Sequence, residues 1–143
     1  MIIQESLKSK MDWYFKEARK HMGHALNIEF MEITEDKLIA EMPVNDNTVQ
    51  PFGILHGGAS VVLAETLASV GAWLNADEGK TAVGVEINAN HIRSVKDGGS
   101  VTGTAVPIKR GRNIQVWETR IEDQKGKLVC VSRCTLAVVS MRN

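Results

Sequence analysis

Apolar residues follow a helical spacing at the start of the chain, form a nearly continuous run in its middle, and alternate with polar residues thereafter. In the first segment the apolar positions recur every three or four residues, at Leu7, Met11, Tyr14, Phe15 and Ala18. This spacing predicts an amphipathic helix over 5–21, which we expect Gly23 to end.

The middle run predicts a buried helix over 56–75. Within Ala59–Leu74 the only charged residue is Glu65. A helix of this run rises about 24 Å, too short for a hydrocarbon core of about 30 Å. A carboxylate at its centre also argues against a membrane span. We therefore expect the core helix of a soluble protein.

The alternating stretches predict strands joined by short turns. We expect strands over 25–33, 37–43, 81–92, 100–108, 114–122 and 127–139. In the strand over 81–92, the side chains of Val83, Val85, Ile87 and Ala89 would share one face. Since only a few residues separate consecutive strands, the last four are predicted to form an antiparallel meander.

A helix that is apolar on all sides must be covered around most of its circumference. One long helix and a strongly curved sheet meet this need if the sheet wraps around the helix. We therefore expect an α+β fold, in which a curved antiparallel sheet of five or six strands surrounds the central helix.

Composition limits the class of protein. The chain has 143 residues, 43% of them hydrophobic, with 17 Lys and Arg against 17 Asp and Glu. These values are typical of one soluble domain, here 1–143, and a net charge of zero argues against a nucleic-acid or anionic-membrane partner. Cys130 and Cys134 would lie about 13 Å apart on one strand, too far for a disulfide. Because the first residues do not resemble a secretory signal, we expect a cytoplasmic protein.

Glu65 is the most unusual residue of the buried helix. Ionised carboxylates are rarely buried without a partner, because desolvation is costly. Either Glu65 is solvated or paired with a distant Arg at a gap in the sheet, or it serves in a cleft as nucleophile or general base. Ser69, four residues on, would share its face and could hold a water.

His56, Gly57 and Gly58 lie where a loop becomes this helix. The N–H groups of a first helical turn have no internal partner, and glycine lets a ligand approach them. Gly57 is therefore a candidate oxyanion donor, assisted by the Gln50 amide, although a glycine hinge capped by His56 accounts for the same residues.

The spacing of these candidates favours a site made by two chains. Eight residues, about 12 Å along a helix, separate Gly57 from Glu65. Both must reach one carbonyl group, at roughly 3 Å from each. Two chains, with Gly57 of one facing Glu65 of the other, would meet this requirement more easily than one.

Two basic clusters lie at strand ends. One contains His91, Arg93 and Ser94, and the other Arg110, Gly111 and Arg112. Arg forms bidentate contacts with phosphate, so these clusters suit a phosphorylated ligand, but a solvated basic turn is the simpler alternative. The chain has no zinc, dinucleotide or serine-hydrolase motif, so no metal site is predicted.

The segment Val49–Ser60, followed by Leu63-Ala64-Glu65 and Ser69, resembles the hot-dog-fold acyl-CoA thioesterases. The resemblance covers nearly the whole chain. It is strongest to the 4-hydroxybenzoyl-CoA, 1,4-dihydroxy-2-naphthoyl-CoA and phenylacetate-degradation types. It implies a hot-dog fold, whose central helix and curved sheet agree with the pattern above.

The resemblance also implies a role for each candidate. Glu65 matches the catalytic carboxylate, Gly57 the N–H that polarises the thioester carbonyl, and Gln50 the side chain that assists it. His56 matches the histidine beside that carbonyl or beside the leaving thiolate, and Ser69 the position that holds the hydrolytic water.

The two basic clusters match the family's CoA contacts more loosely. The family also implies a homo-oligomer, a dimer of dimers with sites between subunits, and no cofactor apart from the CoA portion of the substrate.

We therefore expect hydrolysis of an aryl- or medium-chain acyl-CoA to the free acid and CoA. A 1,4-dihydroxy-2-naphthoyl-CoA hydrolase of quinone biosynthesis is one specific alternative. A hydratase or dehydratase of the same fold, and a non-catalytic acyl-CoA binding domain, are alternatives of other classes.

Overall fold

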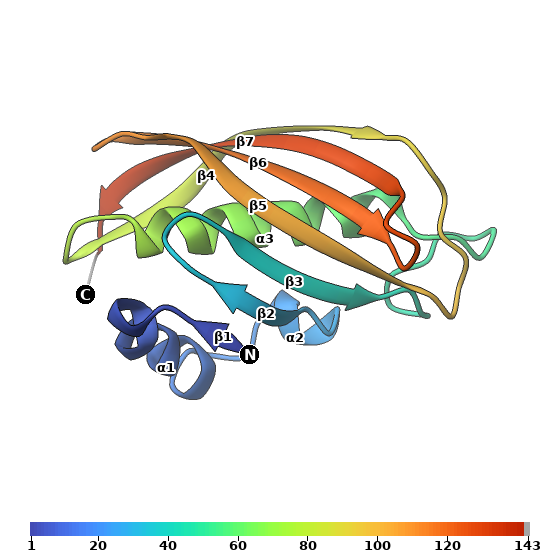
Figure 1. Ribbon diagram of the computed structural model, residues 1–143, viewed down its shortest axis with the longest axis horizontal. Helices are drawn as coiled ribbons and strands as arrows, with labels where there is room; N and C mark the ends of the chain where they lie inside the picture. Colours follow the sequence, from blue (N-terminus) through green and yellow to red (C-terminus); the bar gives the residue numbers. More distant parts are fainter. Residues whose placement is uncertain (142–143) are drawn as a thin grey trace.

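A long central helix organises the molecule, for which a computed structural model describes residues 1–141. The helix α3 (Gly57–Leu74) contacts β3, β4, β5, β6 and β7, and most of its residues are buried. Figure 1 shows it lying along the concave side of the sheet. His56 caps its beginning and Asn75 its end, so the predicted helix over 56–75 and the sheet around it are confirmed.

The sheet has seven strands rather than five or six. Their order is β1-β2-β3-β5-β6-β7-β4, with β1 parallel to β2 and every other pair antiparallel. The strands are β1 (Ile2–Ile3), β2 (Glu29–Ile33), β3 (Leu38–Pro43), β4 (Lys80–His91), β5 (Ser100–Arg110), β6 (Ile114–Asp123) and β7 (Leu128–Ser140). The strand β1 was not predicted because two residues are too short to show alternation.

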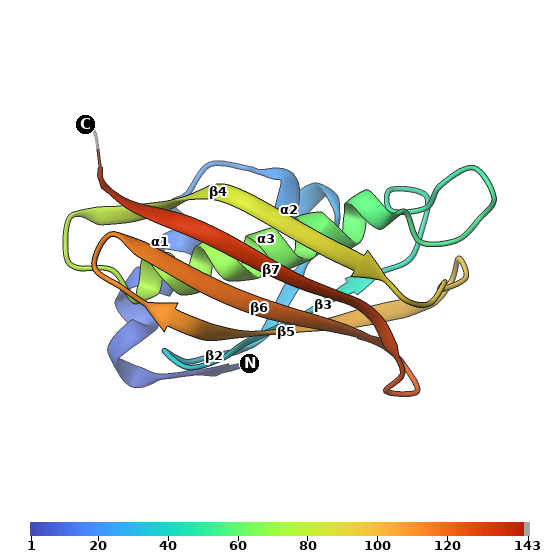
Figure 2. The ribbon, with the colours of Figure 1, turned by 90° about the horizontal axis from the view of Figure 1, so that it is seen from above.

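The predicted four-strand meander is wrong in one place: β4 pairs with β7 and not with β5. Figure 2 shows β4 at the edge of the sheet beside β7. The segment 92–99 crosses the end of the sheet instead of forming a hairpin turn. At the start of this segment, the Ile92 N–H donates a hydrogen bond to the Val129 carbonyl oxygen of β7. At its end, the Gly99 carbonyl oxygen accepts a hydrogen bond from the Val44 N–H. Only β5, β6 and β7 form a meander.

The N-terminal helix is shorter than the predicted 5–21. A 3₁₀ turn (Glu5–Leu7) leads into α1 (Lys8–Lys16), and a separate short helix, α2 (Met22–Ala25), follows. The helix α1 ends because the N–H groups of Glu17 and Ala18 both donate to the Trp13 carbonyl oxygen. Gly23 therefore lies within α2 instead of ending a helix, and β2 begins four residues later than predicted.

The strand β4 contains a bulge that changes which side chains face the helix. Gly84 pairs with Leu136 and Glu86 with Thr135, so Val85 is an extra residue. Ile87 and Ala89 pack against the core as predicted, whereas Val83 and Val85 are exposed. The expectation that all four share one face is wrong, because an inserted residue reverses the alternation.

A buried polar chain supports the second half of α3. The Gln115 amide donates to the Ala72 carbonyl oxygen at 3.0 Å and accepts from the Trp117 indole N–H at 2.9 Å. The Trp117 ring is fully buried and lies against Gly71, where a Cβ atom would come within 2.6 Å of the ring. Glycine is therefore needed at position 71 for the helix to approach β6.

We predict that Gly71→Ala destabilises the protein by about 1–3 kcal/mol, although alanine is the better helix former. Chemical denaturation measures this change in the free energy of unfolding. Trp117→Phe should relieve part of the clash, so the double variant should lose less stability than the sum of the single variants. Strict additivity would contradict the proposed contact.

Candidate active site

The sheet and the N-terminal segment leave one stripe of α3 partly open. It follows the helical spacing and consists of Val62, Glu65, Thr66, Ser69 and Trp73. The helix α1 lies over its end, where the Trp13 and Trp73 rings are 5.9 Å apart. A cleft of about 380 Å³ between this stripe and residues Tyr14 and 21–23 contains both Glu65 and Ser69.

Glu65 is partly buried and its carboxylate lies against β4. A Cβ atom at Gly84 would collide with Glu65 Oε2, so this glycine leaves space for the carboxylate. None of the ion pairs formed within residues 1–141 includes Glu65, so no Arg among these residues neutralises its carboxylate. The carboxylate is therefore available to a ligand in the cleft.

The charge on Glu65 affects a neighbouring thiol. Burial, followed by the carboxylates of Glu65 and Glu86, raises the pKa of Cys134 to about 11. Cys134 and Cys130 are both free and buried. These cysteines therefore remain protonated near neutral pH.

A second cleft, of about 370 Å³, lies at the N-terminus of α3 and is lined by Gln50, Gly57, His91, Arg93 and Ser94. The His91 ring lies over Gly57, where a Cβ atom would come within 2.9 Å of Nε2. The Gln50 Oε1 atom accepts from the Phe52 N–H, which leaves the Gln50 amide N–H groups free to donate. The chain thus gathers several hydrogen-bond donors around the start of the helix.

His56 caps the helix, as one of the two interpretations predicted. Its Nδ1 accepts from the Gly58 N–H at 2.7 Å, and its ring occupies the space that a Cβ at Gly58 would need. The cap is therefore confirmed, and because it does not use the N–H of Gly57, the role of this N–H as an oxyanion donor stays a prediction.

The two clefts do not share a lining residue. Glu65 and Ser69 line one, whereas Gln50, Gly57 and His91 line the other. Within one chain, the structure therefore does not bring the candidate carboxylate and the candidate oxyanion donor together, in agreement with their spacing along the helix.

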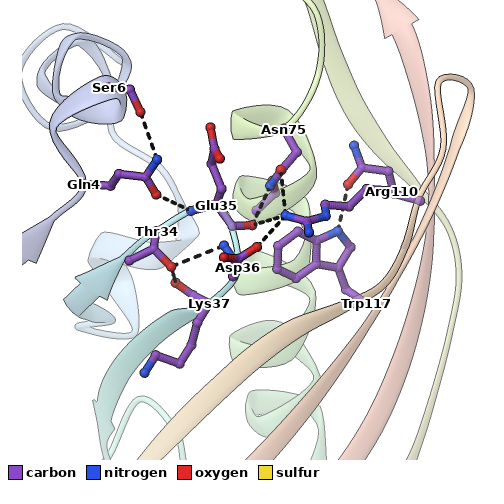
Figure 3. A network of polar contacts seen from close by, with 11 residues as sticks. Gln4, Ser6, Thr34, Glu35, Asp36, Lys37, Asn75, Arg110 and Trp117 are labelled. Atoms are coloured by element: carbon purple, nitrogen blue, oxygen red, sulfur yellow. Dashed lines mark hydrogen bonds and ion pairs between the residues drawn. The ribbon is translucent and has the colours of Figure 1, made fainter.

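The two basic clusters lie at opposite ends of α3. His91, Arg93 and Ser94 are near its N-terminus, whereas Arg110 is beside Asn75 at its C-terminus, as Figure 3 shows. Arg110 Nη1 donates to Asp36 Oδ1 at 2.7 Å and to the Glu35 carbonyl oxygen at 3.2 Å.

Gly111 and Arg112 lie in the turn that follows Arg110, where the Gly111 N–H donates to the Ile114 carbonyl oxygen. One chain therefore does not combine the two clusters into a single phosphate site. The predicted contact of Arg110, Gly111 and Arg112 with CoA stays a prediction.

Sequence reasoning missed the residues that extend the cluster around Arg93. A polar groove of about 550 Å³ continues from Arg93 and Ser94 to Lys96, Lys125 and Lys127. Asp123, in the same groove, has a lowered pKa because it accepts hydrogen bonds from the Lys127 and Lys125 N–H groups and lies near Arg93. The segment 123–126 indicated only a turn before the predicted strand over 127–139, and nothing local placed it beside Arg93.

We predict a loss of stability at alkaline pH that depends on Cys134. Above pH 9 the unfolded thiol ionises, whereas the folded thiol stays protonated up to about pH 11, so the free energy of unfolding falls across this interval. Urea denaturation from pH 8 to pH 11 should show a shallower fall for Cys134→Ala. Glu65→Gln should also reduce the fall, and identical slopes in all three proteins would contradict this placement of Glu65.

The chain is similar to known proteins over most of its length. Residues 52–130 match the family model of the thioesterase superfamily. Over 114 residues it is 50% identical to a 1,4-dihydroxy-2-naphthoyl-CoA hydrolase of Escherichia coli, covering 80% of this chain and 83% of that protein. The Listeria monocytogenes protein of the same name is 46% identical over 121 residues, covering 85% of this chain and 98% of that one.

A solved structure of a thioesterase from Haemophilus influenzae superimposes with a TM-score of 0.83. It is 46% identical, and the match covers 94% of this chain and 92% of that chain. The family match and the superposition agree with the helix and the sheet described above. The chain belongs to the thioesterase superfamily, and it is a thioester hydrolase with the hot-dog fold.

Proposed function

We propose that this protein hydrolyses aryl- or medium-chain acyl-CoA thioesters, with Glu65 as its catalytic carboxylate. The observation that carries the proposal is the position of Glu65, a carboxylate without a cationic partner among residues 1–141, in a cleft on the central helix. A carboxylate that lines a cleft without a cationic partner is a candidate catalytic group.

Glu65 can act by either of two routes with the same products. As a general base it accepts a proton from water, whose oxygen attacks the thioester carbonyl carbon while the C–S bond breaks and CoA leaves as a thiolate. As a nucleophile it attacks the carbonyl carbon itself, the C–S bond breaks and CoA leaves as a thiolate. Water then hydrolyses the resulting mixed anhydride to the carboxylic acid and the free Glu65 carboxylate. Both routes convert the thioester and one water to a carboxylic acid and CoA thiol, and Ser69 in the same cleft is suited to orient the water.

The thioester carbonyl oxygen would accept a hydrogen bond from the Gly57 N–H of a partner chain. This N–H belongs to the first helical turn and carries the positive end of the helix dipole, which suits a developing oxyanion. The free Gln50 amide and the His91 ring lie in the same cleft as Gly57 and are available to assist it. Because this cleft and that of Glu65 are separate within one chain, we assign the complete site to two chains.

The exposed edge of β4 is the surface that we propose for this pairing. This strand pairs with β7 on one side only, and its exposed residues include Val83 and Val85. A twelve-residue strand with one unpaired edge favours pairing with another strand. A second copy of β4 would extend the sheet and bring a partner chain close to Gly84, beside Glu65. A dimer of dimers built on this contact is the assembly that the family implies.

An apolar cleft next to Ser69 supports an aromatic acyl group. It measures about 310 Å³, and Trp13, Tyr14 and Trp73 are among its lining residues. These rings offer faces for stacking and few polar groups. The two relatives whose names specify 1,4-dihydroxy-2-naphthoyl-CoA make that thioester the first aryl substrate to assay.

The polar groove from His91, Arg93 and Ser94 to Lys125 and Lys127 is the site that we propose for the nucleotide and phosphates of CoA. It begins in the cleft that holds Gly57 and contains several cationic side chains. Thioester hydrolysis with these groups needs no metal or separate cofactor, and we place the protein in the cytoplasm, where reduced thiols such as Cys130 and Cys134 persist.

A non-catalytic acyl-CoA binding domain is the alternative that the same clefts allow. It would bind acyl-CoA without releasing thiol, whether or not Glu65 is present.

We predict that Glu65→Gln lowers kcat for acyl-CoA hydrolysis by about a thousandfold or more, since it removes the base or nucleophile at little steric cost. Release of CoA thiol measures the rate, and circular dichroism confirms the fold. Gly84→Ala should also lower kcat, because its methyl group would displace the Glu65 carboxylate. Wild-type rates in Glu65→Gln would exclude the mechanism.

Hybrid oligomers test whether one site uses two chains. Glu65→Gln and Gly57→Val should each be inactive alone. After the two proteins are unfolded and refolded together, half of the dimers are mixed and each contains one intact site, so activity should return to about a quarter of the wild-type value. No recovery in dimers shown to be mixed would place the whole site within one chain.

We also predict that Arg93→Ala, alone or with Lys125→Ala and Lys127→Ala, raises KM for acyl-CoA by about tenfold or more. The KM for the same acyl group on pantetheine, which lacks the nucleotide, should not change. Arg110→Ala is the matched control at the other end of α3, for which we expect an unchanged KM. A CoA-specific rise in KM for Arg110→Ala would assign its turn to the site of a neighbouring chain.

A further inference from the structure

Phe52 is the most exposed large apolar side chain among residues 1–141, with 89% of its surface accessible. It belongs to a tightly bonded turn. The Gly53 N–H donates to the Gln50 carbonyl oxygen at 3.0 Å, and the Gln50 side chain accepts from the Phe52 N–H. The Gln50 N–H in turn donates to the Ile54 carbonyl oxygen at 2.9 Å. The phenyl ring is therefore held outward by an ordered segment.

This turn and the apolar cleft lie at opposite ends of α3. Figures 1 and 2 both show the segment 45–56 continuing beyond the start of the helix. The cleft of about 310 Å³ lies near the end of the helix, where Val70 and Trp73 line it. Thirteen positions separate Gly57 from Val70, which is about 20 Å along the helix. Phe52 therefore cannot cover the apolar cleft of its own chain.

The two-chain site proposed above carries the turn of one chain to the cleft of the other. In a two-fold dimer, Gly57 of each chain can face Glu65 of the other only if the two α3 helices run antiparallel. A residue five positions before Gly57 then lies about level with the residue five positions after Glu65. These two residues are Phe52 and Val70, and Val70 lines the apolar cleft.

The strand β4 gives a second, independent register for the same dimer. The Glu65 carboxylate lies against Gly84, and the His91 ring lies over Gly57. When Gly57 of one chain faces Glu65 of the other, His91 of the first chain therefore lies about level with Gly84 of the second. The two β4 strands run antiparallel, as their helices do.

Continuing this strand register by three positions sets Thr81 of one chain about level with Ser94 of the other. The segment after Ser94 is bonded to the exposed turn, since the Asp97 N–H donates to the Gly53 carbonyl oxygen at 3.0 Å. Thr81 in turn lines the apolar cleft. The helix and the strand thus agree in bringing the turn of one chain to the cleft of its partner.

We propose that Phe52 of one chain forms a wall of the acyl cleft of its partner and determines specificity there. This inference rests on the proposed thioesterase function and its two-chain site. The phenyl ring packs against the acyl group from the side opposite Trp13, Tyr14 and Trp73. The Gln50 amide of the same turn is available to the thioester carbonyl, so one turn contacts both the carbonyl and the acyl chain.

The first experiment compares kcat/KM for acetyl-, octanoyl- and 2-naphthoyl-CoA in the wild type, Phe52→Ala, Phe52→Leu and Ile108→Ala. An acetyl group ends at the carbonyl beside Glu65 and does not enter the apolar cleft, whereas the two larger groups do. Ile108 is another exposed apolar residue, and it lines none of the clefts described above, so Ile108→Ala is the matched control.

Phe52→Ala should lower kcat/KM for octanoyl- and 2-naphthoyl-CoA by about tenfold or more, because it removes apolar contacts with the acyl group. Its kcat/KM for acetyl-CoA should stay within about twofold of the wild-type value, since that substrate makes no such contact. Phe52→Leu should keep most of the preference for the larger groups, and Ile108→Ala should keep all of it.

Hybrid dimers of Glu65→Gln and Gly57→Val then show which chain supplies the ring. Their one intact site takes Glu65 from the Gly57→Val chain and Gly57 from the Glu65→Gln chain. Phe52→Ala added to the Glu65→Gln chain should remove the preference for the larger acyl groups. The same substitution added to the Gly57→Val chain should leave that preference unchanged.

Several results would overturn the role of Phe52. Phe52→Ala could change no rate, or lower all three equally, as a residue that only stabilises the dimer would. In the hybrids, the loss of preference could follow the Gly57→Val chain or both chains alike, or mixed dimers could have no activity. A wild type that hydrolyses none of the three thioesters would instead refute the proposed function.

Discussion

The enclosure of an apolar helix by a curved sheet is the constraint on which the rest of this structure depends. The helix α3 cannot face water around its circumference, so the strands wrap around it and their curvature follows from its presence. The enclosure is incomplete along one stripe, and this stripe carries Glu65 and Ser69. Hydrophobic packing thus determines both where the core lies and where a polar side chain can reach a ligand.

The helix α3 also holds the chemical groups of the candidate site at separate points along its length. Its first turn offers backbone N–H groups and lies near His91 and Arg93, its middle offers a carboxylate, and its end is tied to Arg110 and Asn75. A rigid helix keeps these groups at constant distances. A substrate that needs the first two groups at one carbonyl must find them on different chains, so the geometry of a single element favours assembly.

Much of the fold follows from the sequence because its strongest signals are local. The uniform hydrophobicity of 59–74 could only be a buried helix, and the alternation in 100–139 could only be strands. Pairing of β4 with β7 could not be predicted, because it depends on the path of 92–99 and not on the pattern within either strand. The short helix α2 was hidden for another reason: its cap is a histidine side chain, which composition does not reveal.

The candidate site likewise contains some residues that the sequence reveals and others that it does not. Glu65 was identified because a charge in an apolar helix is conspicuous, and Gly57 because glycines precede that helix. Lys125 and Lys127 lie near Arg93 only through the turn between β6 and β7, and surface lysines in a turn have no distinctive pattern.

The bulge at Val85 has a consequence for the far end of β4. After the bulge, residues an even number of positions from Val85 face the helix and the others face outward. His91 is six positions from Val85. The position of the His91 ring over Gly57 therefore depends on the number of residues between Val85 and His91 as much as on the contacts of the ring. A single residue inserted between Glu86 and His91 would turn the imidazole away from the helix even if every side chain were retained, whereas many substitutions there would leave it in place.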